Sequence, residues 1–218
     1  MKKFLFPLVV MLIFCSSVMA QQSQELRRSQ SALYFEEFKD AKILQPFGRS
    51  VKAKANFMLK NGALCYMEDG KIMQAYTHNI IGVEIDTLKF MKVDNEQMGR
   101  IIASKGFNHL LCVTKADMVK YKSETEGGEN LPYLELTDVG GFYEIDSDAM
   151  SREYDKGIPL QDEYYFYIKG VVIPAAESKF KKYVRPEMKK AFKNLMGDRW
   201  WSWKDPESLK ELLPYLPD

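Results

Sequence analysis

Between Val51 and Val93 apolar and polar residues alternate, and short turn sequences interrupt the alternation. Successive side chains of a β-strand point to opposite faces of a sheet, so this pattern predicts strands that bury one face. The interruptions fall at Asn61-Gly62, Asp69-Gly70 and Asp86-Thr87, and the first two are residue pairs typical of two-residue hairpin turns. The region therefore predicts an antiparallel meander of consecutive hairpins.

Each turn also predicts which residues face each other across its hairpin. A type I′ turn at Asn61-Gly62 requires positive φ at both positions, and it would place Leu59 opposite Leu64 and Phe57 opposite Tyr66. The other two turns predict further pairs: Glu68 with Lys71, Met67 with Ile72, Ile85 with Leu88, Glu84 with Lys89, and Val83 with Phe90.

Strand-like runs continue after the meander, at 100–103, 108–114, 119–121, 133–136, 141–145 and 164–173. The acidic, glycine-containing stretch 123–130 is the best candidate for an internal boundary, and the polar stretch 146–161 predicts a loop. Farther on the period becomes helical, because apolar residues recur on one helical face: Phe180, Val184, Met188, Phe192 and Leu195. Asp205-Pro206-Glu207 has the residues of a helix start, with a cap, a first-position proline and an acid in the first turn.

Together these patterns predict a mainly β protein of the α+β class. We expect an antiparallel meander sheet, or an open barrel or roll, over 41–173. We expect two or three helices in a C-terminal segment, 174–218, packed on that sheet. The apolar helical stripe is too continuous to remain in water, so this segment is expected to be an integral part of the fold.

The first twenty residues have the parts of a secretory signal peptide. Two lysines form a positive head, an apolar run covers 4–14, and a small residue, Ala20, ends the segment. The run is too short to span a bilayer, so we expect cleavage after Ala20, no transmembrane segment in the remaining chain, and a polar leader at 21–40. A lipid anchor at Cys15 is less favoured, because Phe14 stands where that processing needs a small residue.

The charge balance restricts the classes of partner that the protein is expected to bind. The chain has 31 basic and 30 acidic side chains, and loss of the two leader lysines leaves a slight net negative charge. That balance argues against nucleic acid and against an anionic membrane surface as partners. The sequence thus indicates an exported globular protein of the periplasm or cell envelope, with the extracellular space as a further possibility.

Cysteine and histidine are scarce in the part that remains. Cys65 and Cys112 each lie in an apolar run, which favours separate buried thiols over a disulfide, although an oxidising compartment would permit the bond. A Cys/His hydrolase would need Cys112 to meet His78 across strands, because His109 and Cys112 are three apart and face opposite sides of one strand. No catalytic residue, metal site or cofactor is predicted.

The acidic side chains Glu144, Asp146, Asp148, Glu153 and Asp155 could gather a calcium ion. The stretch departs from the helix–loop–helix calcium pattern, because Met150 stands where an oxygen ligand belongs and no glycine follows it. Solvated loop acids are therefore the favoured interpretation. Paired carboxylates for glycoside hydrolysis stay open as an alternative, since their separation is a property of the folded chain.

Three tryptophans within 199–204 give the chain its most unusual local composition. Trp200, Trp201 and Trp203 are the candidate ligand-binding residues, because exposed indole rings stack on sugars and anchor protein partners. The favoured interpretation is structural packing between two amphipathic helices, with at least one ring partly exposed.

Several segments resemble a group of functionally uncharacterised exported proteins of Bacteroidetes bacteria. The segments are Lys52-Ala53-Lys54-Ala55-Asn56-Phe57, Asn61-Gly62, Asp69-Gly70-Lys71, Val83-Glu84-Ile85, Lys89-Phe90, 180–186 and 206–215. The group shares a hairpin-rich region with lysine, asparagine and glycine, followed by two small lysine-rich helices. The resemblance implies an exported, β-rich protein and transfers no catalytic residue.

Two functions from different classes follow. The first is a non-catalytic envelope protein that acts as a binding or structural module and whose partner is an envelope protein or a glycan. The second is a glycan-binding accessory or hydrolytic protein that uses Trp200, Trp201 and Trp203 together with loop acids.

Overall fold

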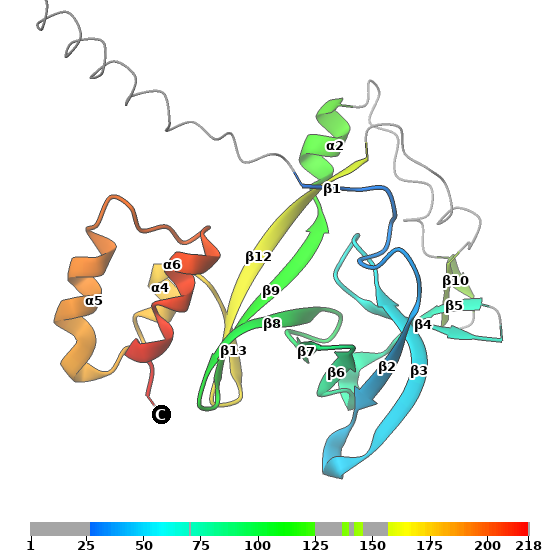
Figure 1. Cartoon of the computed structure of the whole chain (residues 1–218), viewed down its shortest axis with the longest axis horizontal. Coiled ribbons are helices and arrows are strands. Elements are labelled where there is room, and N and C mark those ends of the chain that lie inside the picture. Colours follow the sequence, from blue (N-terminus) through cyan, green and yellow to red (C-terminus); the bar gives the residue numbers. More distant parts are fainter. Residues whose placement is uncertain (1–26, 70, 125–136, 140–141, 146–156, 218) are drawn as a thin grey trace, which may run out of the picture.

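The computed structural model describes residues 27–69, 71–124, 137–139, 142–145 and 157–217. Within these ranges one antiparallel sheet curls into a half-barrel, and short C-terminal helices pack at one end of it (Figure 1). The predicted fold class, a mainly β α+β protein with an open-barrel sheet and C-terminal helices, is confirmed.

The strands are β1 (Arg28–Ser29), β2 (Lys39–Leu44), β3 (Ser50–Phe57), β4 (Leu64–Glu68), β5 (Lys71–Gln74), β6 (Gly82–Ile85), β7 (Leu88–Lys92), β8 (Met98–Lys105), β9 (Asn108–Ala116), β10 (Thr137–Val139), β11 (Phe142–Ile145), β12 (Ile158–Ile168) and β13 (Val171–Pro174). The α-helices are α2 (Met118–Glu124), α4 (Glu177–Phe180), α5 (Lys189–Met196) and α6 (Pro206–Lys210). Short 3-10 helices lie at Pro46–Gly48, Thr77–Asn79, Pro186–Met188 and Leu213–Tyr215.

The strand order is β1-β12-β9-β8-β7-β6-β2-β3-β4-β5-β11-β10, and β13 pairs with β12 beside this path. Strands β6 to β9 form one run of consecutive hairpins and β3 to β5 form another. The two runs are joined where β2 lies between β6 and β3. Strand β12 returns from far along the sequence to pair with β9.

Two of the three predicted hairpin registers are confirmed. Glu68 pairs with Lys71 and Met67 with Ile72 across the β4–β5 turn, where Asp69 has φ 48°. Across the β6–β7 turn, where Asp86 has φ 51°, the pairs are Ile85 with Leu88, Glu84 with Lys89 and Val83 with Phe90, as predicted.

The register predicted for Asn61-Gly62 is wrong by two residues, because Phe57 pairs with Leu64 rather than with Tyr66. The loop is longer than a type I′ turn: the Met58 N–H donates to the Ala63 carbonyl at 2.8 Å, and φ is positive only at Gly62. Leu59 bonds to distant backbone instead, since its N–H donates to Ala32 and its carbonyl accepts from Ala116. Long-range bonds therefore outweigh the local turn preference.

Other predicted boundaries also change. The run 119–121, predicted as a strand, lies in the helix α2, and 164–173 is a hairpin that turns at Lys169-Gly170 rather than one strand. Strand β12 begins at Ile158, inside the predicted loop, and β1 lies inside the predicted leader. The predicted run 133–136 lies outside the described residues.

Cross-strand pairing defines two faces of the sheet. One face carries four residues that pair in succession across neighbouring strands: Phe90 on β7, Arg100 on β8, Cys112 on β9 and Tyr164 on β12. We call this face the inner face. The other is the outer face. One end of the inner face is filled by an aromatic cluster, defined as Tyr34, Phe35, Phe57 and Phe90, in which Phe57 and Phe90 stack with centroids 4.2 Å apart.

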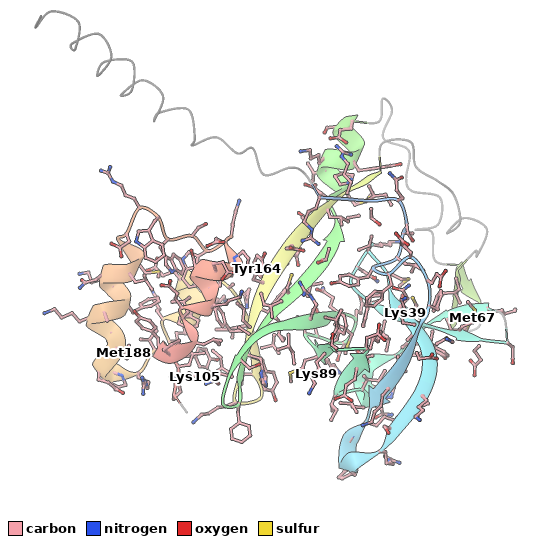
Figure 2. The ribbon with its side chains drawn as sticks, viewed as in Figure 1. Lys39, Met67, Lys89, Lys105, Tyr164 and Met188 are labelled. Atoms are coloured by element: carbon pink, nitrogen blue, oxygen red, sulfur yellow. The ribbon has the colours of Figure 1, made fainter. Side chains whose placement is uncertain are left out.

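The other end of the inner face is covered by the helical layer, defined as residues 177–216. Phe180, Val184, Phe192 and Leu195 of the predicted stripe are buried there, and Met188 is half-buried at the outside (Figure 2). They pack with inner-face residues of the sheet: Leu110, Phe166 and Ile168. Asp205 caps α6 as predicted, because its carboxylate accepts from the backbone N–H groups of Glu207 and Ser208.

Candidate functional site

A groove of about 830 Å³ lies on the outer face. Its walls come from β6, β7 and β8 on one side and from the β12–β13 hairpin on the other. The apolar side chains that line it are Ile81, Met91, Val93, Ile101, Tyr167 and Val172. We call this cavity the outer groove.

Glycine explains why the outer groove stays open. Gly82 lies opposite Met91, and a Cβ at position 82 would come within 2.9 Å of the Phe90 carbonyl oxygen. A side chain there would also project toward Leu44, whose Cδ1 would be 3.6 Å from that Cβ. The absence of a side chain lets β6 approach β7 closely and leaves space above the strand.

Charged side chains stand around the apolar groove. Glu84 lies between two lysines, with its carboxylate oxygens 3.6 Å from Lys42 Nζ and 3.9 Å from Lys89 Nζ (Lys89 is shown in Figure 2). Lys92 borders the groove at the end of β7, but it pairs with Met98 and so lies on the inner face with Phe90. His78, in the 3-10 helix after β5, is exposed and completes the lining.

A second cavity, of about 350 Å³, lies on the inner face between the sheet and α6. We call it the inner cavity. Its polar lining comes from Arg27, Arg100, Asp162, Glu207 and Lys210, together with Cys112 and Tyr164. Tyr164 lies on β12 on the side of the helical layer (Figure 2).

Most charges of the inner cavity are paired with one another. Asp162 accepts from the Arg27 guanidinium at 2.5 Å and from the Thr114 hydroxyl at 2.6 Å. Lys210 donates to Glu207 at 2.6 Å. Arg100 differs, because its Nε is buried and, among the described residues, none gives Arg100 a hydrogen bond or an ion pair.

The inner cavity is not arranged for nucleophilic chemistry. Burial, with a smaller contribution from the Asp162 charge, raises the pKa of the Cys112 thiol to about 12, so the thiol stays protonated at neutral pH. Burial and Asp162 likewise raise the pKa of Tyr164 to about 12. Cys65 is a second free, buried thiol, and its pKa is also raised by burial. The two cysteines are separate, as the sequence favoured.

The structure does not bring Cys112 and His78 together, since Cys112 lines the inner cavity and His78 the outer groove. His109 lies near Ser104, with 2.8 Å between Nδ1 and Oγ, and its ring is 5.7 Å from that of Tyr167. Burial lowers the pKa of His109. The contact between Cys112 and His78 that a Cys/His hydrolase would require is therefore not formed.

The tryptophans separate into two environments. Trp201 and Trp203 meet edge to face with centroids 4.7 Å apart, and both pack against the helical layer. Trp203 also lies 6.0 Å from Phe180. Trp200 is 60% exposed, which agrees with the expectation that one ring would remain accessible. The three rings do not form one exposed platform.

Glu144 lies in β11 and the acids at 146, 148, 153 and 155 lie outside the described residues, so the predicted acidic stretch has no described site geometry. Within the described ranges no group of three His, Cys, Asp or Glu side chains converges as metal ligands would. In the same ranges no helix has the length and apolar character to cross a bilayer.

Sequence reasoning missed both cavities. A signal for the outer groove was present, because Met91 and Ile101 are apolar residues on the face opposite to Phe90 and Arg100, where an outward surface would ordinarily be polar. No local signal marks the inner cavity, since its lining joins residues from four elements and from the segment before β1. Comparison of the chain with family models, curated proteins and solved structures finds no match in any of the three.

Proposed function

We propose that this protein is exported and acts as a non-catalytic binding protein whose outer groove holds an acidic amphiphile. By that we mean a molecule with one apolar chain and one acidic group. The observation that carries the proposal is the size and lining of the groove. Its volume of about 830 Å³ falls in the range of about 300–1,000 Å³ that is usual for ligand pockets, which are mainly apolar with a few polar groups.

The charges at the groove favour an acidic group on the ligand. Lys89 lies on the outer face beside Glu84, and the contact between the two side chains is long, at 3.9 Å. A carboxylate bound beside Lys89 would give this cation a closer counter-ion. An apolar chain would then lie along Met91, Ile101 and Tyr167.

The lining also favours binding over catalysis. His78 is the one histidine of the groove among the described residues, and no serine, threonine or cysteine lines the groove beside it. A nucleophile and its base must lie within hydrogen-bond reach of each other, and this lining offers no such pair.

The test is a titration of the purified protein with 11-(dansylamino)undecanoic acid, followed by competition with dodecanoate and with dodecanol. We expect dodecanoate to compete at least about tenfold better than the alcohol, because only the acid pairs with Lys89. Ile81→Glu puts a charge in the groove at a position that is 53% exposed, and it should abolish binding. Val51→Glu is the matched control, since Val51 is 48% exposed and lies outside the groove.

A second pair of variants tests the acidic group. Lys89→Met should reduce the preference for dodecanoate over dodecanol, whereas Lys105→Met, at an exposed position outside the groove, should leave it unchanged. Absence of binding by the parent protein, or equal loss in Ile81→Glu and Val51→Glu, would contradict the proposal.

Export rests on the sequence of residues 1–20, which lie outside the described residues. Intact-mass measurement of the protein recovered from the cell envelope should give a chain that begins at Gln21. A species that keeps Met1, or one that begins at a lipid-modified Cys15, would contradict it.

The glycan alternative keeps one supporting observation, the exposed ring of Trp200. A soluble-glycan binding assay with the parent and with Trp200→Ala tests it directly. Binding that is lost in this variant, at unchanged melting temperature, would favour the glycan function.

A further inference from the structure

Arg100 is the exceptional residue of the inner cavity. It lies on β8 with Cys112 opposite it on β9, and Tyr164 is opposite Cys112 on β12. Its Nε is buried without a hydrogen-bond partner, and no described residue forms an ion pair with its guanidinium. A guanidinium has five donors, and leaving a buried one without an acceptor costs stability. The guanidinium of Arg100 is therefore available to a ligand, although leaving it without a partner lowers the stability of the protein.

The surrounding charges specify what would satisfy this group. The charges cancel within the Arg27–Asp162 pair and within the Lys210–Glu207 pair. Among the described lining residues, Arg100 therefore contributes the one charge that is not compensated. A ligand with one negative charge would complete the balance. A dianion would meet repulsion from the carboxylates of Asp162 and Glu207.

Tyr164 supplies a second polar group in the same cavity. Its pKa is raised to about 12, so its hydroxyl keeps its proton at any physiological pH. Within the described part of the chain that hydroxyl has no hydrogen-bond partner. It can donate one hydrogen bond to an anion and accept one from a ligand hydroxyl.

We propose that the inner cavity is a binding site for a small, polar monocarboxylate. The guanidinium of Arg100 forms two parallel hydrogen bonds with the two carboxylate oxygens, the geometry that arginine is suited to provide. The Tyr164 hydroxyl bonds to the ligand from β12. The volume of about 350 Å³ admits a molecule of a few heavy atoms and excludes a long apolar chain.

This site is separate from the outer groove. Ile101 on β8 borders both cavities, but Arg100, Cys112 and Tyr164 line the inner cavity and not the groove. Binding at the inner site can consequently be tested independently of the binding proposed for the outer groove.

The experiment is isothermal titration calorimetry of the full protein at low ionic strength with lactate, lactamide and inorganic phosphate. Lactamide has nearly the shape of lactate without its charge, and phosphate is largely a dianion near neutral pH. We expect lactate to bind at least about tenfold more tightly than lactamide and more tightly than phosphate. Ile81→Glu, which blocks the outer groove, should bind lactate like the parent protein.

Variants of Arg100 assign the site. Arg100→Met should lose at least about tenfold in lactate affinity, and Arg100→Lys should lose less because a point charge remains without the planar fork. Arg199→Met removes an exposed arginine elsewhere and should change nothing. Arg100→Met is expected to fold, since it removes a buried donor that has no partner among the described residues, and a thermal melt without ligand checks this.

The outcomes decide the proposal in either direction. Lactate binding that depends on Arg100 and persists in Ile81→Glu supports the inner site. Equal affinities for lactate and lactamide, unchanged affinity in a folded Arg100→Met, or no lactate binding by the parent protein would each overturn it.

Discussion

The two ends of the inner face are covered in different ways. At one end the aromatic cluster fills the half-barrel with side chains from β3, β7 and the segment before β2. At the other end the helical layer, which comes last in the sequence, covers β9, β12 and β13. The inner cavity lies where the second covering meets the first. The inner face of one sheet is therefore covered by aromatic side chains at one end and by helices at the other, and polar groups remain at the boundary between the two coverings.

The difference shows which interactions each end depends on. The barrel end contains two hairpins, β4–β5 and β6–β7, whose registers are fixed by turns between residues close in sequence. The helical layer is bound mainly by apolar contact: Phe180, Leu209 and Leu212 are completely buried there. Its 3-10 and α-helical pieces are short, so packing rather than helix propensity stabilises them.

Removal of the helical layer should cause the largest loss of stability. Truncation after Ile173 would expose Leu110, Phe166 and Ile168 on the sheet. Each large side chain contributes about 1.5–3 kcal/mol when buried, and the sum over this interface rivals the whole stability of an ordinary domain, about 5–15 kcal/mol. We expect aggregated or protease-sensitive protein. A soluble fragment 21–173 that melts cooperatively near the parent temperature would show that the barrel end stands alone.

Gly62→Val tests the barrel end. Gly62 has φ +72°, and a Cβ there would lie 2.6 Å from Val113 Cγ1. Backbone strain of about 1–3 kcal/mol and overpacking of similar size should together cost about 2–6 kcal/mol. Gly48→Val is the control, because Gly48 has the same φ and no atom within 4 Å of its added Cβ. Urea unfolding should show a larger loss in the free energy of unfolding for Gly62→Val than for Gly48→Val. Equal losses would contradict the predicted clash with Val113.

Tryptophan substitutions compare buried and exposed rings within the helical layer. Trp203→Ala removes the ring that contacts Phe180 and Trp201, and we expect a loss of about 2–3 kcal/mol, below the about 3–5 typical of fully buried aromatic residues. Trp200→Ala should change the free energy of unfolding by less than about 0.5 kcal/mol, because the ring is largely exposed. Denaturation curves in which Trp200→Ala is the more damaging change would reverse this assignment.

Asp205→Ala gives the smallest expected effect and sharpens the account of α6. Loss of the cap should cost about 1 kcal/mol, since the backbone N–H groups of Glu207 and Ser208 lose their acceptor. Hydrogen bonds from Ser208 are the main cause of the lowered pKa of Asp205. The cap is therefore fully formed above the ordinary aspartate pKa of 3.8 and is lost as the pH falls below it. The difference in melting temperature between parent and Asp205→Ala should shrink in that acid range, and a constant difference would contradict it.

Sequence reasoning predicted the parts of the fold whose causes are local. The turns at Asp69 and Asp86 fix their registers through residues within a few positions, and the Asp205 cap needs only the next three residues. The prediction failed at Asn61-Gly62, where Leu59 bonds to Ala32 and Ala116, residues that a local pattern does not connect. The Lys169-Gly170 turn was missed because apolar residues continue on both sides of it.

The two cavities could not be predicted for a related reason. Alternation assigns Arg100 and Tyr164 each to a face of its strand, but the pairing of β12 with β9 decides that they share one cavity. Whether α6 leaves or fills the space above them depends on packing between segments far apart in the chain. The fold class follows from short-range patterns, and the sites follow from long-range contacts.

The pairing of β1 with β12 has a consequence for the order of folding. Arg28 lies opposite Pro159, and the neighbouring Arg27 reaches Asp162, 135 positions away in the chain. Closing so long a loop is entropically unfavourable until other contacts have brought its ends together. We therefore expect the segment that contains β1 to be among the last to dock, after the hairpins downstream have assembled.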